Sequence, residues 1–233
     1  MYLDDLPDVA EARLIKAHAL GHRVSEGGRT VAVAFTGNGD SAPQSWIVRF
    51  ELLQREDPRR RLGDAFAQTG ASAFWYFGGD PIARRAVAAL GFESTPRLAV
   101  LTRRVEPAPF RGGIVLRSAT DLDFDTRTLA THHLAGFAQP RFAAAIAGGE
   151  IVGFAILEEL SPTWSELSAF VYPSLRRRGY GTEILAKGAD VAERTGRNVC
   201  ATADVGREPE RTALERAGFR LADYYFLARP KPP

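Results

Sequence analysis

The sequence predicts a mixed α/β fold composed of two related halves. Residues 73–93 and 199–220 share one order of elements: a short apolar strand, a helix of about three turns, a glycine at the C′ position and a second strand. Both helices are rich in alanine and end in Gly-Phe, at Gly91-Phe92 and Gly218-Phe219. Between the halves, prolines and glycines in Val105–Gly113 break regular structure. We therefore predict two tandem domains, at residues 1–106 and 107–233, that arose by duplication.

The remaining elements follow from apolar runs and from the turn residues between them. In the first half they are a helix at 8–20, strands at 30–35 and 46–53, a short helix at 58–68 and a strand at 96–101. In the second half they are a strand at 114–117, one or two helices within 122–134, a hairpin of strands 142–146 and 151–157, strands at 166–172 and 221–228, and a helix at 181–194. Gly148 and Gly149 suit the tight turn of the hairpin.

Composition narrows the class of protein. The chain is 45% hydrophobic and 25% charged, as in ordinary globular proteins, and its formal net charge of +2 does not favour nucleic acid or a membrane as partner. Cys200 is the only cysteine, which excludes an intramolecular disulfide and a thiolate metal cluster. The acidic N-terminus does not resemble a signal peptide, and no apolar run is long enough to span a bilayer. We expect a cytoplasmic protein without a metal cofactor.

The segment that indicates chemistry runs from a strand into a helix over Val171–Thr182. Gly179 and Gly181 carry no side chain, so their N–H groups are accessible to an anion. The first turn of the following helix adds unpaired N–H groups and the positive end of its dipole. Residues 176–178 are arginines, whose guanidinium groups suit phosphate oxygens. A diphosphate is the ligand that this combination favours.

Two other phosphate motifs do not fit this spacing. A dinucleotide fingerprint needs a small residue at position 184, which is Ile184, and a P-loop needs Gly-Lys-Ser/Thr at its end.

The segment resembles the signature of the GCN5-related N-acetyltransferase (GNAT) superfamily, Arg/Gln-x-x-Gly-x-Gly/Ala, here Arg176-x-x-Gly179-x-Gly181. The resemblance extends over about residues 112–230 and includes the hairpin and the late Leu214–Phe219. It implies a mixed, mostly antiparallel sheet flanked by helices, with acetyl-CoA as the acyl donor. The residues that it implies for binding the coenzyme are Ala169, Phe170 and Val171 beside the pantetheine arm, and Arg176, Arg177, Arg178, Gly179, Tyr180, Gly181 and Thr182 around the diphosphate.

By the same resemblance, the first half is a degenerate copy. Arg59–Gly63 follows a strand but offers one glycine where the signature has two. We expect this half to pack against the other half and to help form the acceptor pocket. A second active site there is the alternative.

Glu166 is the first candidate for the general base that takes the amine proton, with Glu158 and Glu159 as rivals. Strand alternation places Trp164, Glu166, Ser168 and Phe170 on one side. The tyrosine that often serves this family as general acid is replaced by Leu214, and the asparagine at the start of that helix by Arg207. The other candidates for the acid are Tyr172, Tyr180 and Tyr224.

Adjacent helical residues point about 100° apart, so His132-His133 does not suit a shared metal ion. We therefore predict an acetyl-CoA-dependent N-acetyltransferase that acts on a primary amine, favouring a small molecule, as a monomer with two pseudo-symmetric halves or as a homodimer. A non-catalytic coenzyme A-binding scaffold and a peptide or protein N-acetyltransferase are the alternatives.

Overall fold

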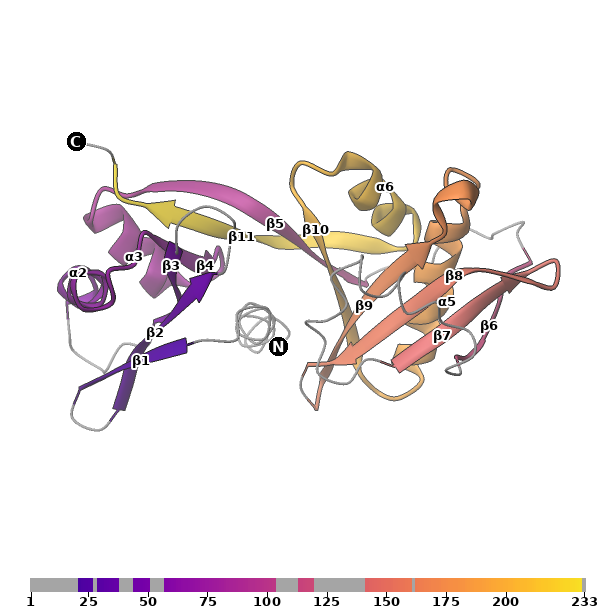
Figure 1. Ribbon diagram of the computed structural model, residues 1–233, viewed down its shortest axis with the longest axis horizontal. Helices are drawn as coiled ribbons and strands as arrows, with labels where there is room; N and C mark the ends of the chain where they lie inside the picture. Colours follow the sequence, from indigo (N-terminus) through magenta and orange to yellow (C-terminus); the bar gives the residue numbers. More distant parts are fainter. Residues whose placement is uncertain are drawn as a thin grey trace. The chain divides into compact units, whose positions relative to one another are not determined.

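The computed structural model describes residues 21–26, 29–37, 44–50, 57–103, 113–119, 141–160 and 162–231. The chain divides into two compact units (Figure 1). The first comprises residues 1–98 together with 223–233, and the second comprises residues 99–222.

The described part of the first unit combines strands of a sheet with the helices α2 and α3. Its elements are β1 (Gly21–Glu26), β2 (Arg29–Gly37), β3 (Gln44–Phe50), α2 (Pro58–Thr69), β4 (Ala73–Phe77) and α3 (Pro81–Ala89). The strand order is β1-β2-β3-β4-β11-β5. The β3–β4 pair is parallel, whereas β1–β2, β2–β3 and β4–β11 are antiparallel.

The second unit has a sheet of the same mixed kind. Its elements are β6 (Val115–Ser118), β7 (Arg141–Ala147), β8 (Glu150–Glu159), β9 (Trp164–Val171), the 3₁₀ turn η3 (Pro173–Leu175), α5 (Tyr180–Glu193), β10 (Asn198–Asp204) and α6 (Glu208–Arg216). The strand order is β11-β5-β10-β9-β8-β7-β6. Strands β6 to β9 form an antiparallel meander, and β9 pairs with β10 in parallel.

Two long strands belong to both units. β5 (Glu93–Arg103) and β11 (Phe219–Arg229) have 11 residues each. The unit boundaries fall inside them, at residues 98/99 and 222/223, so the chain passes from one unit to the other within a strand. The division predicted from the sequence differs from this one at residues 99–106 and 223–233. Its boundary at 106/107 lies outside the described residues and stays a prediction.

The helices α2 and α3 begin in the same way. Asp57 and Asp80 are the N-cap residues, and each is followed by a proline at the first helical position. The helices bury apolar side chains against β4, forming a core that includes Ile47, Leu62 and Phe74.

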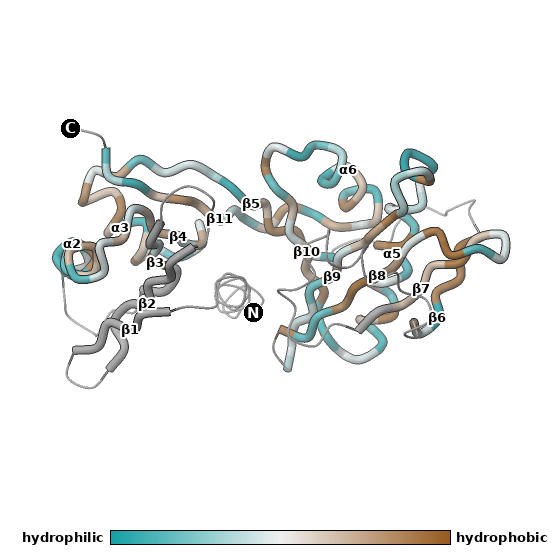
Figure 2. The backbone as a smooth tube through the Cα atoms, in the orientation of Figure 1, coloured by the Kyte–Doolittle hydropathy of each residue, from teal (hydrophilic) through white to brown (hydrophobic). Residues whose placement is uncertain are grey.

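In the second unit, α5 packs closely on the face of β8 and β9. A Cβ at Gly188 would lie 2.9 Å from Leu167 Cδ1, so the helix and the strand are in direct contact there. Figure 2 shows the apolar residues that concentrate in β8 and α5. Phe154, Ile156 and Phe170 form a separate buried cluster. Because Leu167 contacts α5 and successive strand residues alternate, Glu166 and Phe170 lie on the face opposite α5.

The predicted fold class is confirmed: the chain is mixed α/β with mostly antiparallel sheets and flanking helices. The two repeat segments contain helices of 9 residues each, α3 and α6, followed by strands of equal length. That the halves arose by duplication stays a prediction. β1 was not predicted, and the expected helices at 8–20 and within 122–134 lie outside the described residues.

Candidate active site

The parallel strands β9 and β10 separate partway along their length. Their register pairs residues 164–166 with 198–200 and ends at Glu166 opposite Cys200, although β9 continues to Val171 and β10 to Asp204. On its other edge β9 stays paired with β8 to its end, where Val171 lies opposite Gly153. A Cβ at Gly153 would lie 2.1 Å from the Phe170 carbonyl oxygen, so this approach requires glycine. From Leu167 onward, β10 does not pair with β9, and this edge of β9 suits another extended chain.

The loop after β9 turns sharply into α5. Arg177 has φ 64°, the one positive value among the non-glycine residues in the described ranges. Gly179, with φ 84°, is the N-cap of α5 and makes no side-chain cap bond. The residue that begins the helix therefore occupies a left-handed conformation and supplies no acceptor of its own.

The start of α5 leaves a run of amide groups available. The first helical hydrogen bond runs from the Glu183 N–H to the Gly179 carbonyl, 3.2 Å. The described part of the chain supplies no acceptor for the N–H groups of residues 177–182. These amides and the positive end of the helix dipole form a local environment that favours an anion.

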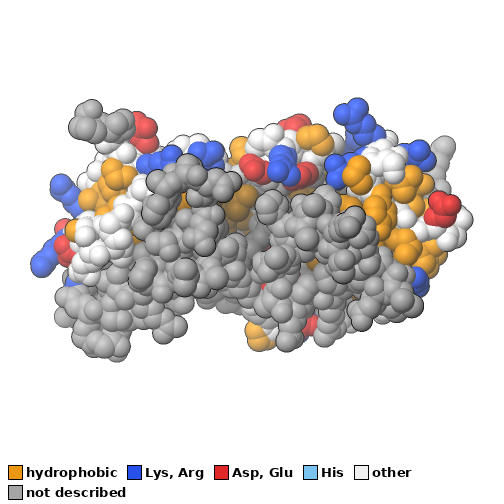
Figure 3. Space-filling model, in the orientation of Figure 1, with side chains coloured by type: hydrophobic (Ala, Val, Ile, Leu, Met, Phe, Trp, Pro, Cys, Tyr) orange, Lys and Arg blue, Asp and Glu red, His pale blue; other side chains and the backbone are white. Residues whose placement is uncertain are grey.

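The three arginines of the loop have different settings. Arg176 donates from Nε to the Val171 carbonyl oxygen, 3.2 Å away, and thereby links the end of β9 to the loop. All three are exposed, and Figure 3 shows basic side chains on the surface of this part of the second unit. Gly181 and Thr182 follow in the first turn of α5 and are half-buried.

Glu166 lies where the β9–β10 ladder ends. It is 3% exposed, and Thr202 Oγ1 on β10 donates to its Oε1 at 2.8 Å. Glu158 is directly opposite Glu166 on β8 and is equally buried. A buried carboxylate held by a hydroxyl donor has the geometry of a base with a defined orientation.

The third candidate carboxylate, Glu159, forms an ion pair with Arg197. Both oxygens of Glu159 contact the Arg197 guanidinium at 2.8 Å. Such a two-point ion pair has a structural function at the end of β8.

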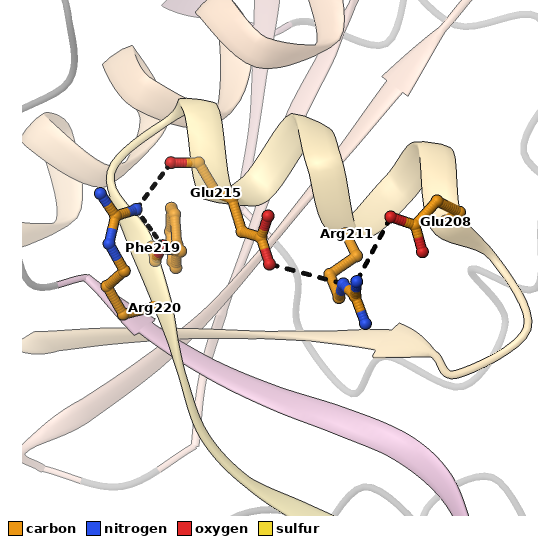
Figure 4. Close-up of polar contacts among 5 residues, drawn as sticks. All are labelled: Glu208, Arg211, Glu215, Phe219 and Arg220. Carbon is orange, nitrogen blue, oxygen red and sulfur yellow. Dashed lines mark hydrogen bonds and ion pairs between the residues drawn. The ribbon is translucent and has the colours of Figure 1, made fainter.

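The helix α6 offers no tyrosine at the family position. Leu214 occupies it and is 4% exposed, and the N-cap Arg207 makes no side-chain cap bond. Instead, α6 carries an ion-pair ladder in which Arg211 lies between Glu208 and Glu215, at 3.3 and 3.4 Å (Figure 4). Arg220 donates to the carbonyls of Glu215 and Phe219 at the end of the helix.

The tyrosines considered as acids fall in different places. Tyr172 follows β9 and packs its ring against Phe154 and Phe170. Tyr180 is the first residue of α5, whereas Tyr224 lies in the first unit.

Sequence reasoning missed two contacts. Thr202 is separated by 36 residues from Glu166, and no local pattern indicates the pair. Glu183 and Lys187 bond to the main chain of Ile114, and their i,i+4 spacing in an apolar helix was the available signal.

Within the described ranges, no group of side chains could hold a metal ion. His132 and His133 lie outside them. No helix among the described residues is long and apolar enough to cross a membrane.

Solved structures identify the class of fold. The chain is similar to an acetyltransferase of the GNAT family from Colwellia psychrerythraea, with TM-score 0.69 and 10% identity over 99% of this chain and 98% of that one. It is similar to a GCN5-related N-acetyltransferase from Kribbella flavida, with TM-score 0.60 and 16% identity over 97% and 96%. A tandem GNAT protein from the clavulanic acid biosynthesis pathway gives TM-score 0.60 and 14% identity over 100% and 98%. The protein therefore has the fold of a GNAT-type acyltransferase.

The family model agrees with the fold. Residues 113–219 match the model of the acetyltransferase (GNAT) family, so the second half of the chain contains a GNAT domain. A comparison with curated proteins found no match. The family resemblance predicted from Arg176-x-x-Gly179-x-Gly181 is confirmed. The degenerate first copy and the roles of individual residues stay predictions.

Proposed function

We propose that this protein is an N-acetyltransferase that transfers an acetyl group from acetyl-CoA to the primary amine of a small molecule. The observation that supports this most is the run of amides at residues 177–182, which lack an acceptor in the described chain and stand beside the β9–β10 opening. In this proposal the amides and residues 176–182 bind the diphosphate. The main chain of Ala169–Val171 pairs with the pantetheine arm as with an added strand.

Direct transfer in a ternary complex needs few chemical groups. The amine nitrogen bonds to the thioester carbonyl carbon, the carbon–sulfur bond breaks, the amine loses a proton and the departing thiolate gains one. Glu166 is the proposed base because it is buried at the end of the β9–β10 ladder and oriented by Thr202.

The main proposal requires a group that protonates the departing thiolate, and a second candidate function follows if the protein lacks one. Leu214 stands where the family often has its tyrosine, and a leucine side chain carries no proton to donate. This observation favours a protein that binds coenzyme A without turning it over. Tyr172 and Tyr180 are the alternative acids in the second unit.

Turnover distinguishes the two candidates. The full chain is incubated with acetyl-CoA and a panel of aminoglycosides, amino acids, polyamines and other small primary amines, and free thiol is measured. The proposal predicts amine-dependent thiol release and an acetylated product by mass spectrometry. Coenzyme A binding without release by any amine or peptide acceptor supports the non-catalytic candidate, and release that requires a peptide supports a peptide or protein acetyltransferase.

Glu166→Gln tests the assignment of the base. The rate should fall most at low pH, where the acceptor amine is protonated and removal of its proton limits the reaction. Glu159→Gln is the matched control, because the same change removes a carboxylate that Arg197 already holds. A pH–rate profile of Glu166→Gln that overlays the wild type would remove Glu166 from this role.

A further inference from the structure

Two charged side chains in the first two turns of α5 take no part in the proposed chemistry, although the proposed anion site lies at the start of that helix. Glu183 belongs to the first turn of the helix and is 3% exposed. Lys187, one turn later, places its Nζ 3.0 Å from Glu183 Oε1. The pair is a buried carboxylate with a partly exposed ammonium group beside it.

This pair binds the chain just before β6. Glu183 Oε1 accepts a hydrogen bond from the N–H of Ile114 at 3.0 Å, and Lys187 Nζ donates to the carbonyl of the same residue. Ile114 is itself 1% exposed. Both of its main-chain polar groups are thus satisfied by side chains four residues apart on α5, which gives Glu183 a structural reason to be buried.

The position of Glu183 has an electrostatic consequence. Helical side chains point toward the N-terminus, so this carboxylate lies at the positive end of α5. In the proposed function, that end is also where the amides of residues 177–182 bind the diphosphate. Because a buried charge is weakly screened, an uncompensated carboxylate there would repel a diphosphate.

We infer that Lys187 is a positioning residue that neutralises Glu183 and so keeps the start of α5 receptive to the diphosphate of coenzyme A. The inference rests on the proposed function. It assigns Lys187 an effect on coenzyme affinity through Glu183, without contact to the coenzyme.

A double-mutant cycle that removes the two charges from the full chain tests this, with coenzyme A affinity measured by titration calorimetry. Lys187→Met should weaken binding by about tenfold or more, whereas Glu183→Gln should bind as tightly as the wild type or more tightly. The double variant should return to within about threefold of the wild type, because it carries neither charge. A purely structural role predicts instead that the double variant binds coenzyme A no more tightly than Lys187→Met, because it has lost both charged contacts to Ile114.

Arg194→Met is the control, because it removes the same charge from the exposed C-cap of α5 and should leave affinity unchanged. Melting curves confirm that each variant is folded at the temperature of the titration. Wild-type affinity in Lys187→Met, or a double variant no tighter than Lys187→Met, would overturn the inference alone. Absence of coenzyme A binding by the wild type would overturn the proposed function as well. If Lys187→Met does not fold, weaker binding by Glu183→Gln overturns the inference and equal or tighter binding supports it.

Discussion

The starts of α2 and α3 in the first unit differ from the start of α5 in the second unit. In the first unit, the Asp80 carboxylate accepts the N–H groups of Ile82 and Ala83 at 2.8 and 3.0 Å, and Asp57 accepts that of Arg59 at 3.0 Å. Pro58 and Pro81 contribute no N–H at all. In the second unit, the N-cap of α5 is Gly179, which supplies no carboxylate, and no proline follows it; the carboxylate of its first turn, Glu183, accepts from the N–H of Ile114.

The unsatisfied N–H groups at a helix start can be capped by a side chain or can bind a ligand. Every helix start presents unsatisfied N–H groups and partial positive charge, and an anion stabilises it. In α2 and α3 the anion is a carboxylate of the chain, so these starts are already occupied. In α5 the glycines leave the position open for a ligand. This supports the proposal that coenzyme A binds at the start of α5.

The arginine runs sharpen the same contrast. Arg59–Arg61 lie inside α2, whereas Arg176–Arg178 lie in the loop before α5. The sequence resemblance between these runs therefore does not extend to their local structure. In the first half the guanidinium groups project from a helix that Asp57 has already capped.

The largest expected effect comes from placing a carboxylate at the second position of α5, beside the amides of its start. Gly181→Asp should weaken coenzyme A binding about 100-fold, because the carboxylate occupies and repels the diphosphate position. A Cβ at Gly181 would lie 3.7 Å from Val171 Cγ2, an ordinary contact, so the fold should tolerate it. An acidic residue in the first turn is also favourable to the helix.

Gly181→Asn is the matched control, since it has the shape of aspartate without its charge. Calorimetry on both variants isolates the charge, and we expect asparagine to cost far less affinity. If both variants bind coenzyme A equally, the comparison between α5 and α2 loses its electrostatic basis.

An intermediate effect should follow from removing the carboxylates of the first unit. Asp80→Ala should lower the free energy of unfolding by about 1–2 kcal/mol, because two N–H groups lose their acceptor, and Asp57→Ala by about 1 kcal/mol or less. Asp80→Asn keeps an acceptor and should restore most of the loss. Denaturant unfolding measures all three. Neither alanine variant should change the affinity for coenzyme A, and a change would show that these helix starts do contribute to the site.

Local patterns were sufficient to predict much of this fold. Alternation and turn residues indicated β7 and β8, and the Gly-Phe signals indicated α3, α6 and the strands that follow them. β1 was missed because Gly21–Glu26 mixes polar and apolar residues without a clear period. The boundaries between the two units, which fall inside β5 and β11, could not be predicted, because they depend on which strands become neighbours.

The candidate site also has features that the local sequence predicts and contacts that it does not. Gly179 and the open amides follow from residues adjacent in sequence, and the prediction of a bare helix start agrees with the structure. The partners Thr202–Glu166 and Arg103–Asp190 are separated by 36 and 87 residues. Such contacts are set by strand order, about which a single segment carries no information.

The smallest expected effect lies at the other end of α5, where carboxylates oppose the dipole. Asp190 and Glu193 lie in its last turn, and Arg103 Nη2 pairs with Asp190 at 3.0 Å. Burial raises the pKa of Glu193 above its usual 4.5, Arg103 lowers it and Asp190 raises it. The folded protein therefore holds this proton more tightly than the unfolded chain. The stability that the group contributes is present below pH 4.5 and is lost as pH rises through the raised pKa.

Glu193→Gln should remove the loss of stability that accompanies ionisation of Glu193. The variant should be more stable than the wild type at about pH 7, by about 0.5 kcal/mol or less because the side chain is largely exposed. The difference should shrink as pH falls to 4.5 and below. Denaturant unfolding at both ends of that range measures it. A variant less stable than the wild type at neutral pH would mean that Glu193 is held by Arg103 more than it is disfavoured by burial and by the helix end. In that case a carboxylate would be tolerated equally at both ends of α5, and the dipole argument for the open start would weaken with it.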